Sequence, residues 1–125
     1  MLRLRSAAAI AALCLASALT TCRGRLPEVD TSDQKLASGQ RVFERRCASC
    51  HNSNGDGKTI TASRFPYANL IDGKWRGDGS QASIEKQVRE GHDPMPRFEG
   101  KLTDEEIRNV SAYVLALAQA ARGKP

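Results

Sequence analysis

Cys47-Ala48-Ser49-Cys50-His51 is the sequence feature that most restricts what this chain can fold around. The spacing C-x-x-C-H is typical of covalent c-type haem attachment. Two thiols three positions apart can each add to one vinyl group of a haem, and the histidine after the second thiol can bind the iron through Nε2. The motif therefore predicts one haem c, attached to Cys47 and Cys50 and ligated by His51.

Three other kinds of site use such a cysteine pair: a redox-active C-x-x-C, half of a zinc site, and a structural disulfide. A zinc site needs two further ligands at short spacing, and the rest of the sequence has no second cysteine pair of this kind. A thioredoxin-like motif lies in a βαβ context, which the sequence does not offer. We therefore favour covalent haem over all three.

The first 22 residues have the pattern of an export signal. Arg3 and Arg5 form a basic start, an alanine-rich apolar run follows over 7–19, and Ala16-Ser17-Ala18 resembles a signal-peptidase site. The apolar run is shorter than a membrane span of about twenty residues. An uncleaved anchor is the alternative. Export agrees with covalent haem, which bacteria attach outside the cytoplasm, so we expect a periplasmic protein.

Cys22 is the cysteine that neither the haem motif nor the body of the signal uses. Leu19-Thr20-Thr21-Cys22 resembles a bacterial lipobox, in which the cysteine becomes the lipidated N-terminus, although Thr21 stands where a smaller residue is usual. Cleavage after Ala18 is the alternative, and it would leave a free thiol. Residues 1–22 are thus predicted as a signal peptide, and an acylated Cys22 would be the only membrane contact.

The net charge of +5 belongs mostly to the ends of the chain. Residues 32–121 contain 13 basic and 12 acidic side chains, a balance of +1. The two propionates of a haem would reverse that balance. Nucleic-acid binding is therefore not indicated.

Periodicity predicts one all-α domain over 32–121, between a linker over 23–31 and a tail over 122–125. Residues 52–79 hold five glycines and one proline and are expected to form a long loop. So long a loop is unusual in a small domain unless something fills its interior. A haem would fill it and supply the missing core, so the apoprotein is expected to be largely unfolded.

Capping patterns mark three helices. Thr31-Ser32-Asp33-Gln34 fits a capping box for a first helix that leads into the haem motif. Ser80 or Ser83 can cap a short helix that ends at Gly91. Thr103-x-x-Glu106 is a capping box for the last helix. The apolar stripe of that last helix consists of Ile107, Val110, Val114 and Leu117.

Met95 is the predicted second ligand of the iron. Pro94 and Pro96 flank it and stiffen the segment, so a soft thioether can be held at iron with little loss of entropy. His92, three residues earlier, is the rival ligand, and an open position is the third option. The choice matters because His/Met ligation raises the reduction potential relative to bis-histidine ligation.

From about Asp33 to Ala121 the chain resembles the class I cytochrome c family. The haem motif followed by Pro94-Met95-Pro96 carries the resemblance, together with Gly39-x-x-x-Phe43 and Val110-x-x-Tyr113. It implies a small cytochrome c fold, with three to four helices wrapped around one haem and long loops. The first and last helices should cross where the glycine permits close approach. Bacterial oxidase-associated haem domains and small periplasmic carriers look most similar.

The resemblance also implies contacts to the haem and its ligand. Tyr67-Ala68-Asn69-Leu70 stands where the family usually has Gly-Pro-x-Leu, whose proline carbonyl accepts a hydrogen bond from Nδ1 of the ligand histidine. Ala68 is expected to take that role. The candidates to hold the propionates are Arg64, Tyr67, Trp75 and Arg76. The candidates to surround the haem edge and steer an acidic partner, unless they are ordinary solvated surface, are Arg45, Arg46, Arg97 and Lys101.

These observations predict an exported monohaem cytochrome that carries single electrons between redox proteins. The expected partners are a periplasmic dehydrogenase and a membrane oxidase or reductase, and the expected state is a monomer without enzymatic activity. One alternative is the electron-accepting haem subunit of a multi-subunit dehydrogenase or oxidase complex. Another is an open-site haem that binds gases or acts on peroxide. No paired carboxylates or nucleophile–base pattern can be found in the sequence, which favours the carrier.

Overall fold

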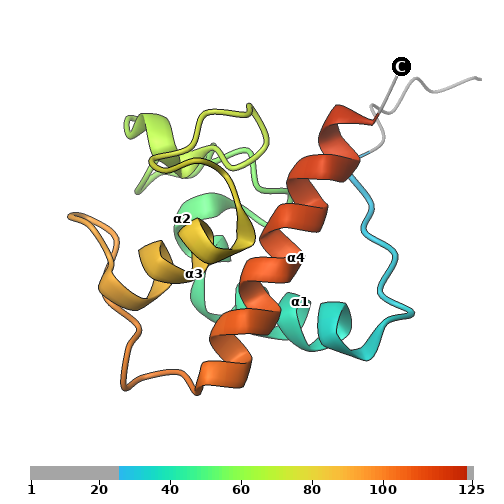
Figure 1. The fold of residues 1–125 in the computed structure, drawn as a ribbon. Helices are drawn as coiled ribbons and strands as arrows, with labels where there is room; N and C mark the ends of the chain where they lie inside the picture. Colours follow the sequence, from blue (N-terminus) through green and yellow to red (C-terminus); the bar gives the residue numbers. More distant parts are fainter. Residues whose placement is uncertain (1–25, 124–125) are drawn as a thin grey trace, which may run out of the picture.

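The computed structural model describes residues 26–123, and its regular secondary structure is helical, with long loops between the helices (Figure 1). Its elements in chain order are α1 (Gln34–Arg46), α2 (Ala48–His51), the 3₁₀ turn η1 (Pro66–Ala68), α3 (Gln81–Glu90) and α4 (Asp104–Arg122). Extended pairing within residues 26–123 is limited to two isolated bridges. The predicted all-α class is confirmed. The predicted signal peptide over 1–22, with Cys22, lies outside the described residues, as do Arg23–Arg25 and the last two residues.

No helix within residues 26–123 is long and apolar enough to cross a membrane.

Helix α1 begins differently from the prediction. The capping box expected from Thr31 to Gln34 does not form, because the N-cap is Asp33, whose carboxylate accepts the Lys35 backbone N–H at 2.7 Å. Aspartate is as good an N-cap as threonine, and here it stands directly before the first helical residue. The prediction had the correct helix but the wrong capping residue.

The other two caps follow the sequence. The Ser80 hydroxyl accepts the Ser83 N–H and starts α3, which ends at Gly91 with a φ of 69°. At the start of α4, Thr103 and Glu106 satisfy each other's backbone N–H groups, and both bonds of this capping box are present. These caps set where α3 and α4 begin, and therefore which faces they turn to the interior.

Helix α1 packs across α4, and Gly39 makes their close approach feasible (Figure 1). A Cβ at Gly39 would overlap the backbone carbonyl of Asn109 and come within 2.9 Å of the Tyr113 Cβ. Next to this point the rings of Phe43 and Tyr113 lie 5.5 Å apart, centroid to centroid. The glycine–aromatic pair of α1 and the aliphatic–aromatic pair of α4, which carried the family resemblance, therefore lie at the crossing of the two helices.

The core lies between α4 and the two helices that pack on it, α1 and α3. All four residues of the predicted α4 stripe are buried, with exposures between 0% and 6%. The rest of the apolar core comprises Val42 and Phe43 of α1, Ile84 and Val88 of α3, Phe98 and Tyr113. The long segment between α2 and α3 and the segment between α3 and α4 cover the remaining side of this core.

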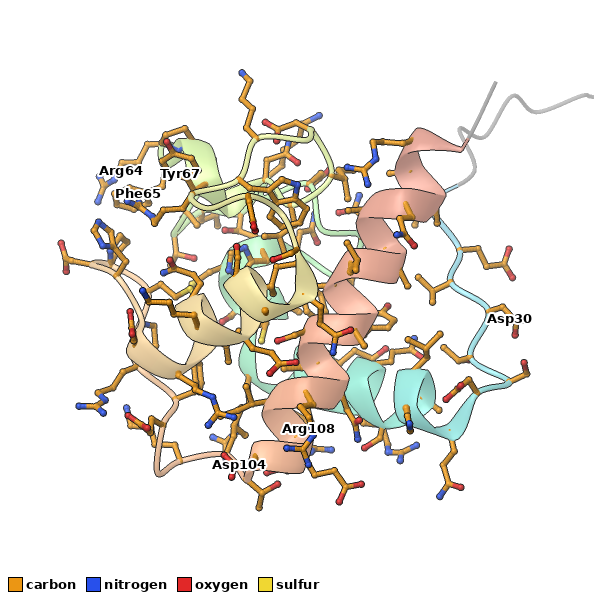
Figure 2. The ribbon with its side chains drawn as sticks, viewed as in Figure 1. Asp30, Arg64, Phe65, Tyr67, Asp104 and Arg108 are labelled. Atoms are coloured by element: carbon orange, nitrogen blue, oxygen red, sulfur yellow. The ribbon has the colours of Figure 1, made fainter. Side chains whose placement is uncertain are left out.

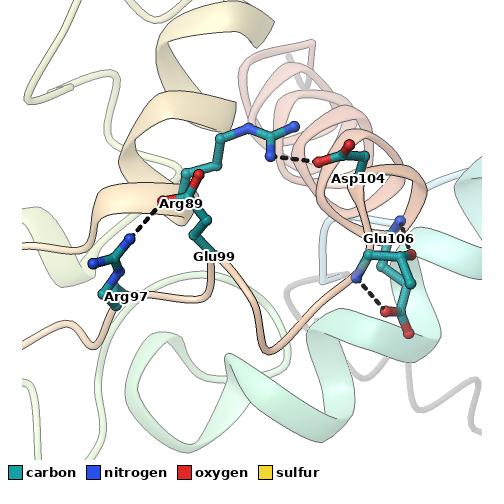
Figure 3. A network of polar contacts seen from close by, with 6 residues as sticks. Arg89, Arg97, Glu99, Asp104 and Glu106 are labelled. Carbon is teal, nitrogen blue, oxygen red and sulfur yellow. Dashed lines mark hydrogen bonds and ion pairs between the residues drawn. The ribbon is translucent and has the colours of Figure 1, made fainter.

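One surface ion pair connects the end of α3 to the start of α4, and a second lies within the segment between them (Figure 3). Arg89 contacts the Asp104 carboxylate at 2.6 Å, and Arg97 contacts Glu99 at 2.5 Å. Backbone bonds support the same connection, since Phe98 N–H donates to the carbonyl of Val88 at 3.1 Å. The segment that carries Met95 is thus fastened to α3 on one side.

Candidate haem site

A cavity of about 370 Å³ lies between α2, α3, α4 and the two long loops. This volume is within the range of small-molecule sites. Eight of the nine predicted site residues line it, namely Cys47, Cys50, His51, Tyr67, Ala68, Trp75, Arg76 and Met95. Arg64 is the exception, and its guanidinium lies over the Phe65 ring, 5.2 Å from the centroid. The cavity therefore brings together residues from four separate stretches of sequence.

The two cysteines and the histidine reach one wall of the cavity through a single tight turn. Helix α1 ends at Cys47, whose carbonyl accepts the backbone N–H groups of Cys50 at 3.1 Å and His51 at 2.9 Å. Cys47 is half-buried and Cys50 is exposed, and neither forms a disulfide. Burial, with a smaller contribution from Cys50, raises the pKa of the Cys47 thiol to about 12. Both sulfur atoms are thus available for thioether bonds, with Cys50 nearer to solvent.

The hydrogen bond of His51 determines its tautomer. Its Nδ1 lies 2.8 Å from the carbonyl oxygen of Ala68. A carbonyl can only accept, so Nδ1 carries the proton and Nε2 keeps a free lone pair. Burial lowers the pKa of His51, and the bond to Ala68 offsets part of that effect. A neutral imidazole with a bare Nε2 is the form that binds iron, and the contact is the one that the resemblance implies.

Gly57 holds the Ala68 carbonyl in place. Sequence reasoning did not identify this residue as part of the site. The Gly57 N–H donates to the carbonyl of His51 at 2.9 Å, and its φ is +67°. A Cβ at Gly57 would lie 2.5 Å from the Ala68 carbonyl carbon and 2.7 Å from its oxygen. Only glycine permits both this backbone conformation and this approach. The alternation of Gly55 and Gly57 just after the haem motif was the available signal.

Met95 comes to the cavity on a tight turn directly after α3. His92 and Met95 exchange two backbone hydrogen bonds, of 2.9 and 2.6 Å, and the Asp93–Pro94 peptide bond is cis. The side chain of Met95 is half-buried against the core. The rival ligand His92 also lines the cavity, but it is exposed.

Gln87 is a second residue that the sequence reasoning missed. Its side-chain amide donates a hydrogen bond to the Met95 sulfur, with 4.0 Å between Nε2 and Sδ. The available signal was its place on α3, next to the buried Val88 and therefore near the core face. A donor to the sulfur orients the thioether and withdraws electron density from it.

The residues present fit a haem c. Two thiols, an imidazole nitrogen and a thioether line one cavity, and most of the remaining wall is apolar, with Ile84, Val88, Phe98, Val110 and Val114 among its residues. Within residues 26–123, no three His, Cys, Asp or Glu side chains gather as ligands for a bare metal ion. The zinc-site alternative therefore finds no further ligands in this part of the chain.

Basic and aromatic side chains lie at the mouth of the cavity. The Arg76 guanidinium stacks on the Tyr67 ring at 4.4 Å from its centroid, and Trp75 is half-buried beside them. Figure 2 shows Tyr67 at one end of the molecule and Asp104 at the other. The cationic groups that could meet carboxylates of a bound group are thus well separated from the acidic start of α4.

Known proteins are similar to this chain over most of its length. The family model described as cytochrome c oxidase, cbb3-type, subunit III matches residues 34–114. Cytochrome c6 of Parathermosynechococcus lividus is 41% identical over 88 residues, covering 70% of this chain and 94% of its own. For cytochrome c6 of Diacronema lutheri, identity is 39%, with 66% and 96% covered. The solved cytochrome c6 of the diatom Phaeodactylum tricornutum superposes with a TM-score of 0.57 at 38% identity, covering 69% of this chain and 97% of that one.

The family model extends over more than half of the chain, and the relatives match nearly their whole length. The chain belongs to the class I monohaem cytochrome c family, whose members are small all-α electron-transfer proteins, not enzymes, with one covalently bound haem c.

Proposed function

We propose that this protein is an exported electron carrier with a His51/Met95-ligated haem, which shuttles between a periplasmic donor and a membrane-bound or soluble acceptor. The observation that supports it is the common cavity of Cys47, Cys50, His51 and Met95, in which Nε2 of His51 is unprotonated. The haem supplies reversible one-electron chemistry between ferric and ferrous iron.

Each residue of the chain has a distinct task in this proposal. Cys47 and Cys50 hold the cofactor covalently, and the Ala68 carbonyl keeps the His51 ring in its ligating orientation through Nδ1. Met95 supplies the second ligand and closes the iron to other molecules. Burial of the site limits solvent reorganisation when the charge on the iron changes. No residue has to move a proton or form a bond during transfer.

Haem retention on a denaturing gel tests covalent attachment. We expect the wild-type protein to keep its haem under peroxidase staining, and the variant with both Cys47→Ala and Cys50→Ala to lose it. Cys22→Ala is the matched control and should retain the haem. Extraction of the haem from the wild type by acidic organic solvent would rule out the proposal.

The axial ligand is tested by spectroscopy. Met95→Ala should abolish the weak near-infrared sulfur-to-ferric charge-transfer band, lower the potential and let exogenous ligands bind. His92→Ala is the control and should leave all three unchanged. If the two variants behave the other way round, His92 is the ligand and the potential belongs to a bis-histidine haem.

The proposed location includes a membrane tether through acylated Cys22. Residues 23–30 could span up to about 25 Å when extended, which would keep the haem near membrane-bound partners. Intact mass and fractionation of the native protein test this. A soluble mature chain that starts at Leu19 would contradict the tether, whereas membrane association that is lost in Cys22→Ala would support it.

A second candidate function is the electron-accepting haem subunit of a larger oxidoreductase complex. One observation favours it, since the matching family model describes a subunit of a cbb3-type oxidase. Purification from the native membrane under mild conditions discriminates between the two. A stoichiometric complex with a catalytic chain would favour the subunit, and a monomer that exchanges electrons reversibly without turnover would favour the carrier.

A further inference from the structure

Gly91, the residue at which α3 ends, lies directly against the backbone that carries Met95. A Cβ at this position would lie 2.7 Å from the carbonyl oxygen of Met95, 2.6 Å from the carbonyl carbon of Pro96 and 2.5 Å from the amide nitrogen of Arg97. Ordinary contacts of a Cβ begin near 3.4 Å, so a residue larger than glycine has no room here. The approach joins two stretches of backbone, and no side-chain rotation could relieve it.

The backbone conformation of Gly91 turns the chain away from the axis of α3. Its φ is 69° and its ψ is −177°, a combination that is essentially limited to glycine. Its N–H still donates to the carbonyl of Gln87 at 2.9 Å, as expected for the residue after a helix. The end of a helix explains the positive φ, but it does not require a second backbone within 2.7 Å. The contact with residues 95–97 is therefore a separate feature of this position.

Hydrogen bonds hold the chain on both sides of this contact. Before it, the His92 N–H donates to the carbonyl of Met95 at 2.9 Å, and the Met95 N–H donates to the carbonyl of His92 at 2.6 Å. After it, the Phe98 N–H donates to the carbonyl of Val88 at 3.1 Å. The carbonyls of a last helical turn have no partner within the helix, and this bond satisfies one of them. We call this arrangement, residues 92–98 on the last turn of α3, the α3 seat.

The side chain of Met95 extends from the α3 seat to the cavity. It is half-buried and lines the same cavity as His51. The side-chain amide of Gln87, which belongs to the last turn of α3, donates to its sulfur over 4.0 Å. One helical turn therefore positions both the backbone and the sulfur of Met95.

We propose that Gly91 is a positioning residue for Met95. Its contact with residues 95–97 sets how closely the Met95 backbone approaches α3, and it thereby keeps the sulfur directed at the iron. This role rests on the proposed ligation of the iron by Met95. With a haem in the cavity the thioether has no room to turn aside, so the sulfur leaves only when the backbone leaves the α3 seat. The seat thus keeps other ligands off the iron.

Binding of imidazole to the ferric holoprotein measures how often Met95 is released. A ligand that binds only a minor open state has an apparent dissociation constant that falls as the open fraction rises. Gly91→Ala should therefore lower the apparent dissociation constant of imidazole by about tenfold or more, a factor that corresponds to about 1.4 kcal/mol. The near-infrared sulfur-to-ferric band should weaken in the same variant. Wild-type values of both would overturn the proposal.

Gly100→Ala is the matched control. Gly100 lies in the same connection between α3 and α4, and its φ of +77° also disfavours alanine, but nothing lies within 4 Å of its Cβ position. This variant should lose stability, keep the near-infrared band and leave the dissociation constant of imidazole within about twofold of the wild type. An equal gain of imidazole affinity in both variants would mean that lost stability alone releases Met95, which contradicts a specific role for Gly91.

Hydrogen exchange of the wild-type holoprotein tests the α3 seat without any substitution, and it decides the question if Gly91→Ala does not fold. With saturating imidazole, the amides of Met95 and Phe98 should lose protection, while the amides inside α3 keep theirs. If both amides stay protected while imidazole is bound, the sulfur leaves by rotation of its own side chain. The seat would then not control ligation, and the proposal would be wrong.

The outcomes separate the role of Gly91 from the proposed ligation. If Met95→Ala keeps the near-infrared band, Met95 is not the ligand, and both proposals fail. If Met95→Ala removes the band while Gly91→Ala keeps the band and the wild-type affinity for imidazole, ligation by Met95 stands and only the positioning role is wrong.

Discussion

Replacement of Gly57 by alanine should weaken the haem site through the backbone alone. A Cβ at this position would lie 2.5–2.7 Å from the carbonyl group of Ala68, where ordinary contact begins near 3.4 Å. The two segments must therefore separate by several tenths of an ångström or more. The His51–Ala68 hydrogen bond is 2.8 Å long and would lengthen beyond useful range. Gly57→Ala thus removes the hydrogen bond that orients His51, the proposed iron ligand, without changing His51 itself.

Two costs in stability add in this variant. An alanine in the left-handed region costs about 1–2 kcal/mol, and loss of the buried hydrogen bond costs about 1 kcal/mol more. We expect guanidinium denaturation to report a decrease of roughly 2–3 kcal/mol in the free energy of unfolding. Gly73→Ala is the matched control, because Gly73 has a φ of +80° with nothing within 4 Å of its Cβ position. The free energy of unfolding of Gly73→Ala should decrease only by the cost of an alanine in the left-handed region, about 1–2 kcal/mol.

The reduction potential of the haem should rise in Gly57→Ala. A hydrogen bond donated by Nδ1 increases electron density at Nε2 and favours ferric iron, so its loss should raise the reduction potential. A differential of about 0.5–1 kcal/mol corresponds to roughly 20–40 mV for one electron. Cyclic voltammetry measures this shift, and Gly73→Ala should show none. Equal potentials and equal stabilities in the two variants would refute the argument that Gly57 supports His51.

Two further outcomes follow from side-chain contacts. Gln87→Leu should lower the potential by roughly 20–40 mV, because the amide that withdraws density from the Met95 sulfur is lost, whereas Gln81→Leu at the start of α3 should leave the voltammogram unchanged. Asp104→Asn should cause a small loss of stability at pH 7, because the hydrogen bond and charge of Arg89 lower the pKa of Asp104. A carboxyl with a lowered pKa stabilises the fold above its unfolded pKa and loses that contribution as the pH falls. The difference in stability between the variant and the wild type should therefore shrink as the pH falls below the ordinary aspartate pKa, and a constant difference would contradict the assignment.

The parts of the fold that the sequence predicted are those that depend on local patterns. The haem motif, the α4 stripe and the cap at Thr103 can each be recognised within a short stretch of sequence. The cap satisfies backbone N–H groups of its own helix, and the stripe lies on one side of that helix. The cap of α1 shows the limit of such patterns. Thr31 and Asp33 are both good N-caps, and the choice between them depends on where the helix comes to rest on α4.

The parts that the sequence did not predict join segments far apart in the chain. The Gly57 approach to Ala68 and the Gln87 bond to Met95 arise only when the loops have packed. Arg64 is a propionate candidate whose position the sequence could not place, and its guanidinium lies over the ring of Phe65, which lines the cavity while Arg64 does not. In a helix or strand the side-chain direction repeats with a fixed period, but an irregular loop has no such period. The direction of a loop side chain therefore cannot be predicted from the sequence pattern.

Ala68 shows how a tertiary contact can survive the loss of the residue that usually supports it. The family places a proline here, which would stiffen the carbonyl that meets His51. In this chain the rigidity comes from two other sources: Pro66 presets the first position of η1, and the Ala68 N–H donates to the carbonyl of Phe65 at 3.0 Å. A proline at 68 has no N–H and could not form that bond. The hydrogen-bonded turn and the close approach of Gly57 from the other side together hold the carbonyl, so the hydrogen bond to His51, the proposed iron ligand, is kept without the family's proline.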